Sequence, residues 1–378
     1  MSDRHTQGQR LPSLDVLRGL TVIGMILVNA TAGMYYGLQA KVFPLLLHAH
    51  WEGLKIADVV FPAFLTMVGL SIPMALHKAK ITTGLNAAQA RKIGWRVVRL
   101  FLIGWLLSNL GWLAHFDGEP WRFWGVLQRI GLVYGAAAVL FLWCGPKTRL
   151  GIAAAILLLY WPLSLLPALD GLPGDIWERG HNFIASVDRL MFGAGGHNYV
   201  KGPEGYDPEG LLGTLPAFAQ ALLGMAAGEF LMRAPKRSAL TLAGAGAALL
   251  IVGAGWGFIF PVIKDIWSSS FVLVTTGITF LALAPLHACL DNRDDPLRGP
   301  LSLPVTFASA FGLNAIAAYV LHFLMNPLLG WDLLTQTYFL SRTTVGEAVA
   351  ALFPVGLFIL CVWLPVEYLR RKGWIIKV

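Results

Sequence analysis

A succession of long apolar segments constrains this chain more than any other feature of its sequence. A membrane-spanning helix needs about 20 mostly apolar residues, and the sequence contains about ten such segments. Their approximate limits are 14–36, 53–76, 93–113, 122–143, 150–168, 211–232, 239–260, 268–290, 303–328 and 346–369. The segments predict an all-α fold, a polytopic membrane helix bundle that forms a single domain over residues 1–378.

Composition agrees with a membrane protein, because 56% of the residues are hydrophobic and only 13% are charged. The 14 Trp and nine Tyr suit the aromatic belts found where a bilayer meets water. The net charge of +8 is scattered over short loops rather than gathered into a patch, so we expect no nucleic-acid partner. Cys144, Cys289 and Cys361 are far apart and support neither a disulfide framework nor a metal motif.

The distribution of Lys and Arg predicts which side of the membrane each loop faces. With a cytoplasmic N-terminus, 20 of the 29 basic residues fall on the cytoplasmic side, eight on the outer side, and Arg129 within a predicted span. Both termini are therefore expected in the cytoplasm. The first segment is followed by an Ala-x-Ala pattern that imitates a signal-peptidase site, but we expect it to be retained because Asp15, Arg18 and Asn29 suit a signal peptide poorly.

The stretch LHAHWEGLKIADVVFP, residues 47–62, places several polar side chains at the outer mouth of the second span. His48 and His50 are candidate bases or nucleophiles, with interfacial residues wetted by water as the alternative. Asp58 is costly to bury alone, so we expect it to meet a histidine or Arg129, and a purely structural ion pair is the alternative. Trp51 is interpreted as an interfacial anchor.

Other polar side chains gather on the same outer half of the membrane. A long outer loop, about 167–210, carries many of them, and loops of that length are usually functional or disordered. Pro208 and Asp207 in YDPEGLLGTLPA also fit an ordinary helix start. A substrate site between helices is expected to gather polar side chains in this way. The residues are Asn29, Gln128, Arg129, Asp188, Arg189, His197, Asp207, Glu209, Lys264, Trp267, Asn314 and His322.

Several of these residues also have a structural interpretation. Arg129 suits a phosphate or carboxylate ligand, but an ion pair with Asp58 or Glu229 is equally open. Asn29, Asn314 and His322 are typical of interhelical hydrogen bonds. Asp15 and Arg18, spaced i and i+3, predict a local pair, with a role near a cofactor phosphate as the sharper hypothesis.

Seven ordered motifs resemble the heparan-alpha-glucosaminide N-acetyltransferase family between about Ser13 and His322. They are SLDVLRGLTVIGMILVN, HAHWEGLKIADVVFPAFLTMVG, VLQRIGLVY, VDRLMFGAGGHNY, YDPEGLLGT, PVIKDIWSSSFV and GLNAIAAYVLH. The resemblance implies a polytopic enzyme that takes acetyl from cytoplasmic acetyl-CoA and delivers it to an amino sugar across the membrane. A bacterial, inner-membrane member is expected, because the luminal domain that precedes the first span in the animal enzyme is absent here.

The resemblance also implies roles for individual residues. His48 matches the family's catalytic histidine, and Asn29 and Asp58 match polar positions beside it. Departures from the family motif occur at His50, where a serine is common, and at Glu52, where an asparagine is usual. His48 is expected to act as base with Asp58 orienting it, or to carry the acetyl group covalently.

The remaining site assignments divide into acceptor and cosubstrate groups. The predicted amino-sugar residues are His50, Trp51, Glu52, Asp188, His197, Asp207, Glu209, Lys264, Trp267, Asn314 and His322, and the predicted acetyl-CoA residues are Arg18, Arg96, Arg99, Gln128 and Arg129. We expect no metal, and the resemblance implies a homodimer. The alternatives are a secondary transporter, which would favour inverted repeats, and an enzyme that O-acylates surface sugars, whose start also resembles LDVLRG.

Overall fold

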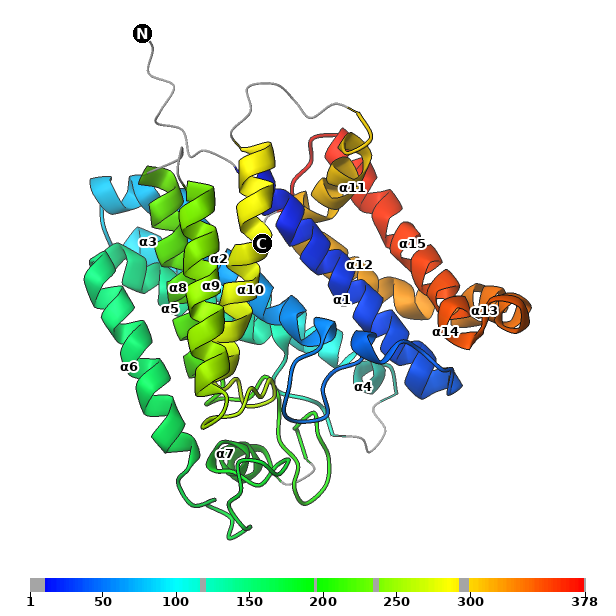
Figure 1. Ribbon diagram of the computed structural model, residues 1–378, viewed down its shortest axis with the longest axis horizontal. Helices are drawn as coiled ribbons and strands as arrows, with labels where there is room; N and C mark the ends of the chain where they lie inside the picture. The colour runs from blue at the N-terminus through cyan, green and yellow to red at the C-terminus, as the bar shows by residue number, and fades with distance from the viewer. Residues whose placement is uncertain (1–10, 116–119, 194–195, 234–237, 292–298, 377–378) are drawn as a thin grey trace. The chain divides into compact units, whose positions relative to one another are not determined.

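The computed structural model describes residues 11–115, 120–193, 196–233, 238–291 and 299–376 (Figure 1). Extended chain within these ranges pairs only at one antiparallel bridge, between Glu52 and Ile263. The expectation of an all-α fold is thereby confirmed. The helices are α1 (Pro12–Leu38), η1 (Pro44–Leu46), α2 (Ile56–Thr82), α3 (Ala87–Ser108), α4 (Leu110–His115), α5 (Val126–Trp143), α6 (Pro146–Ser164), α7 (Phe183–Phe192), α8 (Thr214–Arg233), α9 (Ser238–Trp256), α10 (Ser269–Leu290), α11 (Ser302–Leu313), α12 (Ala315–Leu328), α13 (Trp331–Val345), α14 (Glu347–Ala350) and α15 (Leu352–Arg371).

Seven stretches of helix in the described part of the chain are long and apolar enough to cross a membrane. They are α1, α2, α5, α8, α9, α10 and the run Glu347–Arg371, and an eighth is added if α11 and the first part of α12 make one span. Two of the ten predicted spans, over α3 and α6, do not meet these criteria. In α3 the reason is charge, because Arg91, Lys92, Arg96 and Arg99 lie on one helix. These helices nevertheless identify the chain as a polytopic helical membrane protein.

Contacts within the chain gather into two compact units, each made of separate segments. Among the described residues, unit 1 comprises those in 50–54 and 62–284, and unit 2 comprises those in 11–49, 55–61 and 285–376. The stretch 47–62 therefore contributes to both units. The single domain expected over the whole chain stays a prediction.

Unit 1 holds α3 to α9 with most of α2 and α10. Figure 1 shows α7 at one end of this unit, beside the loop that joins α9 to α10. The polar side chain of Gln220, in the middle of α8, ties three elements together. Its Nε2 lies 3.2 Å from both the Pro62 carbonyl and Thr66 Oγ1 on α2, and 3.1 Å from Thr275 Oγ1 on α10. A buried amide that finds all its partners specifies one packing arrangement, because any other would leave it unsatisfied.

Unit 2 is organised on a close crossing of α1 and α11. A Cβ added at Gly19 would lie 1.8 Å from the Ala308 carbonyl oxygen, and one added at Gly312 would lie 1.7 Å from that of Asp15. Small residues at such positions let helix backbones approach within a membrane. The sequence itself, through these glycines, sets the distance between the two helices.

The span predicted over 303–328 is broken. α11 and the start of α12 meet at an angle of 84°, with Asn314 between them. The Asn314 amide binds the C-terminal segment, where its Nδ2 donates to the Trp374 carbonyl at 3.1 Å and its Oδ1 accepts from the Ile376 N–H at 2.9 Å. At this break, the Asn314 side chain forms hydrogen bonds with the C-terminal segment.

The helix expected to start near Pro208 begins later, at Thr214. The interpretation of Asp207 and Pro208 as an ordinary helix start is therefore wrong. Residues 207–213 form turns instead, because the acidic side chains of this segment bind Arg122 and its N–H groups bind Asp188. The long loop before it, about 167–210, contains a helix that was not predicted, α7, whose start is capped by Asn182 Oδ1 accepting from the Ala185 N–H.

Candidate active site

His48 and Asp58 form a hydrogen-bonded pair in unit 2. The His48 Nδ1 lies 2.7 Å from Asp58 Oδ1, and the side chains are 43% and 0% exposed respectively. The expectation that Asp58 meets a histidine is confirmed. Because a carboxylate only accepts hydrogen bonds, it selects the tautomer with the proton on Nδ1, which leaves the lone pair on Nε2. The pair therefore presents a half-exposed imidazole whose orientation is fixed by a fully buried acid.

The other carboxylate oxygen of Asp58 folds the loop that carries His48. Asp58 Oδ2 accepts from the Ala49 N–H at 3.1 Å and from the Lys55 N–H at 2.9 Å. Asp58 is the third residue of α2, where an acidic side chain commonly reaches back to an unpaired N–H at the helix start. The Lys55 ammonium also donates to the His48 carbonyl, at 3.2 Å. One aspartate thus caps a helix and sets the position of a histidine.

The middle of the same loop belongs to unit 1. Trp51 is only 6% exposed, and its Nε1 donates to the Ile176 carbonyl at 3.0 Å while its ring contacts Tyr206 edge-on. The interpretation of Trp51 as an interfacial anchor is therefore wrong, since its ring is buried in a protein core. His50 and Glu52 are exposed.

A second polar cluster lies in unit 1 and is centred on Arg122. Its guanidinium binds both oxygens of Asp207, with Nε to Oδ2 at 2.9 Å and Nη2 to Oδ1 at 2.7 Å, and also binds Glu209. Its carbon lies 4.5 Å from the centre of the Tyr199 ring. Such two-pronged Arg–carboxylate pairs are the strongest that proteins form. Asp207 and Glu209 therefore each have a protein partner, so a sugar would have to share them.

Asp188, on α7, is the third acid of this cluster. It is 2% exposed and accepts from the Asp207 N–H at 3.3 Å and the Leu211 N–H at 3.2 Å. Burial, assisted by the neighbouring Asp207 charge, raises the pKa of Asp188 to about 7. The Asp188 carboxyl group therefore changes its protonation near neutral pH while it supports the 207–211 turn.

Arg129 is fully buried in unit 1. Its Nη2 donates to the Gly210 carbonyl at 3.0 Å, and its guanidinium lies over the Trp267 ring at 4.9 Å. Its Nε and Nη1 have no hydrogen-bond partner among the described residues. Glu229, one expected partner of Arg129, pairs with Arg149 at 2.6 Å instead. The Arg129 charge is instead offset by nearby acids of the Arg122 cluster, of which Glu209 interacts most strongly.

Trp267 and Gln128 are also buried in unit 1. The Trp267 Nε1 donates to Gln220 Oε1 at 3.0 Å, and its backbone has φ of 56°, which is unusual for a bulky residue. Gln128 Nε2 donates to the Phe123 carbonyl at 3.2 Å. Trp267 therefore has an internal partner, which favours a structural role, whereas the buried Oε1 of Gln128 has no hydrogen-bond partner among the described residues.

The other predicted residues of unit 2 do not gather round the His48 pair through any contact we observe. Asn29 is exposed on α1, and Asn314 is occupied by the C-terminal segment. His322 is buried on α12 against the Phe323 and Phe358 rings. Arg18 pairs with Asp15 at 3.3 Å, which confirms the predicted local pair.

The remaining predicted residues of unit 1 lie at separate places. Arg96, on α3, stacks on the Tyr134 ring at 4.3 Å, and Arg99 donates to the Trp95 carbonyl. His197 stacks on Trp121, with ring centres 4.2 Å apart. Lys264 is half-buried and interacts electrostatically with Glu209.

Comparison with known proteins decides the family. A family model described as "Heparan-alpha-glucosaminide N-acetyltransferase, catalytic" matches residues 10–257. The chain belongs to this family. Curated relatives are the heparan-alpha-glucosaminide N-acetyltransferases of Homo sapiens, 29% identical over 365 residues, and of Mus musculus, 28% identical over 371 residues. These alignments cover 83% and 84% of this chain but 52% and 54% of the relatives, so the chain spans about half the length of the curated relatives it matches.

Family membership makes this chain a member of a group of membrane acetyltransferases, and the resemblance drawn from seven motifs is confirmed. The matched range 10–257 contains the His48–Asp58 pair and the Arg122 cluster. Both polar groups therefore lie in the part of the chain that the catalytic family model describes.

Sequence reasoning missed two residues of these polar groups. Arg122 was interpreted only as one of eight basic residues expected on the outer side. Membrane proteins have few basic residues on that side, so a basic residue there indicates a buried partner. Gln220 stands alone in the middle of an apolar span, and that isolation was a usable signal, because an amide there needs partners on other helices.

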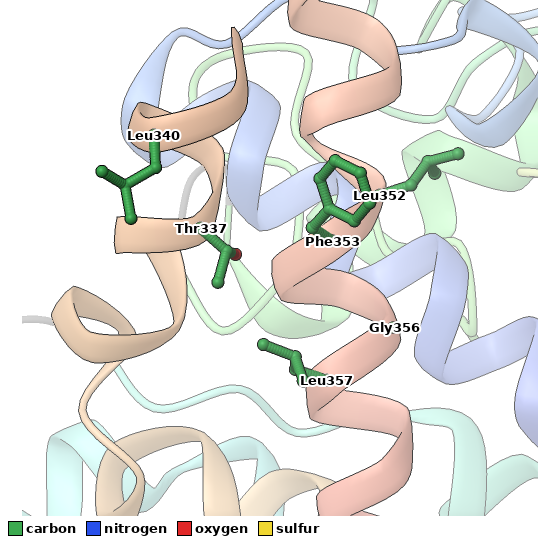
Figure 2. A pocket seen from close by; sticks show the side chains of 6 residues that line it. All are labelled: Thr337, Leu340, Leu352, Phe353, Gly356 and Leu357. Atoms are coloured by element: carbon green, nitrogen blue, oxygen red, sulfur yellow. The ribbon is translucent and has the colours of Figure 1, made fainter. Parts of the chain in front are cut away.

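A surface groove in unit 2 lacks side chains suited to acid–base catalysis. It measures about 580 Å³ and lies between α13 and α15 (Figure 2). Thr337 and Leu357 point toward each other across it, and its lining is Thr337, Leu340, Leu352, Phe353, Gly356 and Leu357. The lining has no ionisable side chain, so the groove offers no group for proton transfer.

Proposed function

We propose that the protein is a multi-pass acetyltransferase of a bacterial inner membrane. It would move acetyl from cytoplasmic acetyl-CoA to the amine of a glucosamine-type sugar on the other side of the membrane. The observation that carries the proposal is the His48–Asp58 pair, in which a fully buried carboxylate orients a half-exposed imidazole. Family membership supports acetyl transfer, and the excess of basic residues on the N-terminal side supports the sidedness.

The chemistry follows from what the acceptor amine requires. A sugar ammonium must lose a proton before its nitrogen can attack, and His48 Nε2 is the group that would take this proton. The nitrogen then forms a bond to the thioester carbonyl carbon, and the carbon–sulfur bond breaks as the oxyanion collapses. The attacking nitrogen loses its second proton as the amide forms, and the departing CoA thiolate takes up that proton, while the first proton leaves His48 to water. Asp58 would stabilise the imidazolium that forms at His48, since its carboxylate lies on the opposite ring nitrogen.

The test is acetyl transfer by the purified full-length protein, measured as release of free CoA thiol in the presence of acetyl-CoA and glucosamine. We expect His48→Ala to lower kcat by about 100-fold or more, because general-base catalysis contributes about 10²–10⁴-fold. Asp58→Asn should also lower kcat strongly, because its amide can donate to Nδ1, which selects the tautomer without a lone pair on Nε2, and because the charge that stabilises the imidazolium is lost.

His50→Ala is the matched control, because His50 is an exposed histidine two residues away. It should keep its kcat, with any loss confined to a higher KM for the sugar, because His50 is a predicted amino-sugar residue and not the predicted base. Loss of activity in His50→Ala alone would assign the base to His50. If no amine in a panel gives CoA release, and vesicles that contain the protein take up sugar in a saturable way, the protein is a transporter and the proposal is wrong. A radiolabelled acetyl group trapped on His48 before sugar is added would show transfer through a covalent intermediate.

A further inference from the structure

Helix α3, in unit 1, carries four basic residues in its first half and no acidic residue that would balance them. Arg91, Lys92, Arg96 and Arg99 lie within about two and a half helical turns. The sequence contains no Asp or Glu over residues 59–116. Within the part of the chain that the structure describes, none of the four forms an ion pair with a carboxylate. Among these described residues, the positive charge of α3 is therefore not neutralised.

The two faces of α3 have different surroundings. One face packs against α5 and is buried, and its residues are Ile93, Leu100, Gly104 and Leu107. The contact is close, because a Cβ added at Gly131 of α5 would lie 3.2 Å from Leu100 Cβ. The opposite face is exposed, and it comprises Arg91, Lys92, Trp95, Val98, Arg99, Leu102 and Leu106. Three of the four basic residues thus lie on the exposed face, while Arg96 stacks on the Tyr134 ring.

The exposed face of α3 changes its character along the helix. Its first half is basic, whereas Leu102 and Leu106 make its second half apolar. Trp95, with 55% of its surface exposed, lies among the basic residues. The Arg99 side chain extends back toward the start of the helix, where its Nε donates to the Trp95 carbonyl at 3.3 Å. Cationic groups and an indole therefore gather at one end of an apolar face, as in a helix that passes from lipid headgroups into hydrocarbon.

We propose that the exposed face of the first half of α3 binds anionic phospholipids of the leaflet that is predicted to be cytoplasmic. Basic residues clustered on such a helix attract lipids with a net negative charge. A soluble phosphate compound would leave the apolar surface of Trp95 and Val98 in water, whereas a phospholipid covers it with its acyl chains. Arg99, predicted from the sequence as an acetyl-CoA residue, would contact lipid instead. The proposal does not depend on acetyl transfer.

The experiment titrates the full-length protein in a neutral detergent with two lipids that differ in headgroup charge. Native mass spectrometry measures the binding of dioleoylphosphatidylglycerol, which is anionic, and of dioleoylphosphatidylcholine, which is not. We expect the unmodified protein to bind the anionic lipid about 10-fold more tightly or better. Arg91→Gln combined with Lys92→Gln should weaken binding of the anionic lipid by about 10-fold and leave phosphatidylcholine binding unchanged. Arg91→Lys combined with Lys92→Arg should retain the preference, because both charges remain.

Lys201→Gln combined with Arg342→Gln is the matched control, because it removes the same charge from exposed positions outside α3. It should bind the anionic lipid as the unmodified protein does. An equal loss in this control, or equal affinity of the unmodified protein for the two lipids, would overturn the lipid site. Displacement of the anionic lipid by free CoA would assign the face to a soluble phosphate compound instead. A lower unfolding temperature of the Arg91→Gln, Lys92→Gln variant without added lipid would make these side chains structural and would also overturn the proposal.

Discussion

Single side chains in this protein owe their properties to burial and to backbone partners. Asp58 and Asp188 are both almost wholly buried and both accept two backbone N–H bonds, yet they serve different neighbours. Asp58 holds the imidazole of His48, whereas Asp188 lies close to the Asp207 carboxylate. Burial, and then the neighbouring Asp207 charge, favour the protonated form of Asp188, so Asp188 is where pH should act on the 167–210 loop.

Asp188 predicts a pH-dependent stability. Its pKa is about 7 in the folded chain against an ordinary value of 3.8, so the folded state binds the extra proton between these values. The stability contributed by protonated Asp188 is complete below about pH 4 and is lost as pH rises through about 7. Asp188→Asn should therefore flatten the fall of the unfolding temperature over this window. Asp332→Asn, at an exposed carboxylate, is the control and should leave the pH dependence of the unfolding temperature unchanged. A pH dependence in Asp188→Asn identical to that of the unmodified protein would contradict the raised pKa of Asp188.

Elements in unit 1 are joined by charge where the chain is irregular. The segment before α5, α7 and the turn before α8 meet at Arg122, Asp188 and Asp207. A buried charge left without its partner is strongly destabilising, which is why such clusters fix loop conformations.

Arg122→Gln should lower the stability of the protein by about 3–5 kcal/mol, because it leaves two buried carboxylates without their cation. Thermal unfolding in detergent measures the change. Adding Asp207→Asn to this variant should recover part of the loss, since one uncompensated charge is removed. Arg342→Gln, at an exposed arginine, should have little effect. The same small effect at Arg122 would show that the ion pairs do not hold the loop.

Elements in unit 2 are joined instead by close backbone contact. Gly19→Ala would place a methyl group 1.8 Å from the Ala308 carbonyl oxygen, so α1 and α11 must separate. We expect a loss of about 1–3 kcal/mol, typical of an overpacked contact. Gly33→Ala, on the same helix with open space at its Cβ, should be neutral or slightly stabilising, because alanine favours the helix. Equal unfolding temperatures for the two variants would argue against the close crossing.

For the whole molecule, sidedness is the property that the proposed transfer across the membrane requires. The charge distribution predicts that the 167–210 loop lies outside and that the C-terminus lies in the cytoplasm. In a variant without its three native cysteines, Lys201→Cys should react with a membrane-impermeant maleimide on intact cells. Lys372→Cys should react only after the cells are opened. The reverse pattern would invert the topology and with it the direction of acetyl transfer.

The sequence alone determined the class of fold, the family and the central pair of residues. Apolar segments of spanning length admit little else than helices, because a bilayer offers the backbone no other hydrogen-bond partner. The cost of burying Asp58 alone predicted a partner, either a histidine or Arg129, and local spacing predicted the pair of Asp15 and Arg18. These inferences succeed because their physical causes lie within a few residues in the chain.

Only the tertiary structure decided which remote polar groups meet. It assigned Asp207 and Glu209 to Arg122, buried Trp51 against Tyr206, and broke the span at Asn314. Each of these contacts joins residues from 60 to 155 positions apart, as in the pairs Asn314–Trp374 and Trp51–Tyr206. Local patterns carry no information about such pairs, since a buried polar group satisfies its hydrogen bonds with whichever partner the packing of the helices brings within reach.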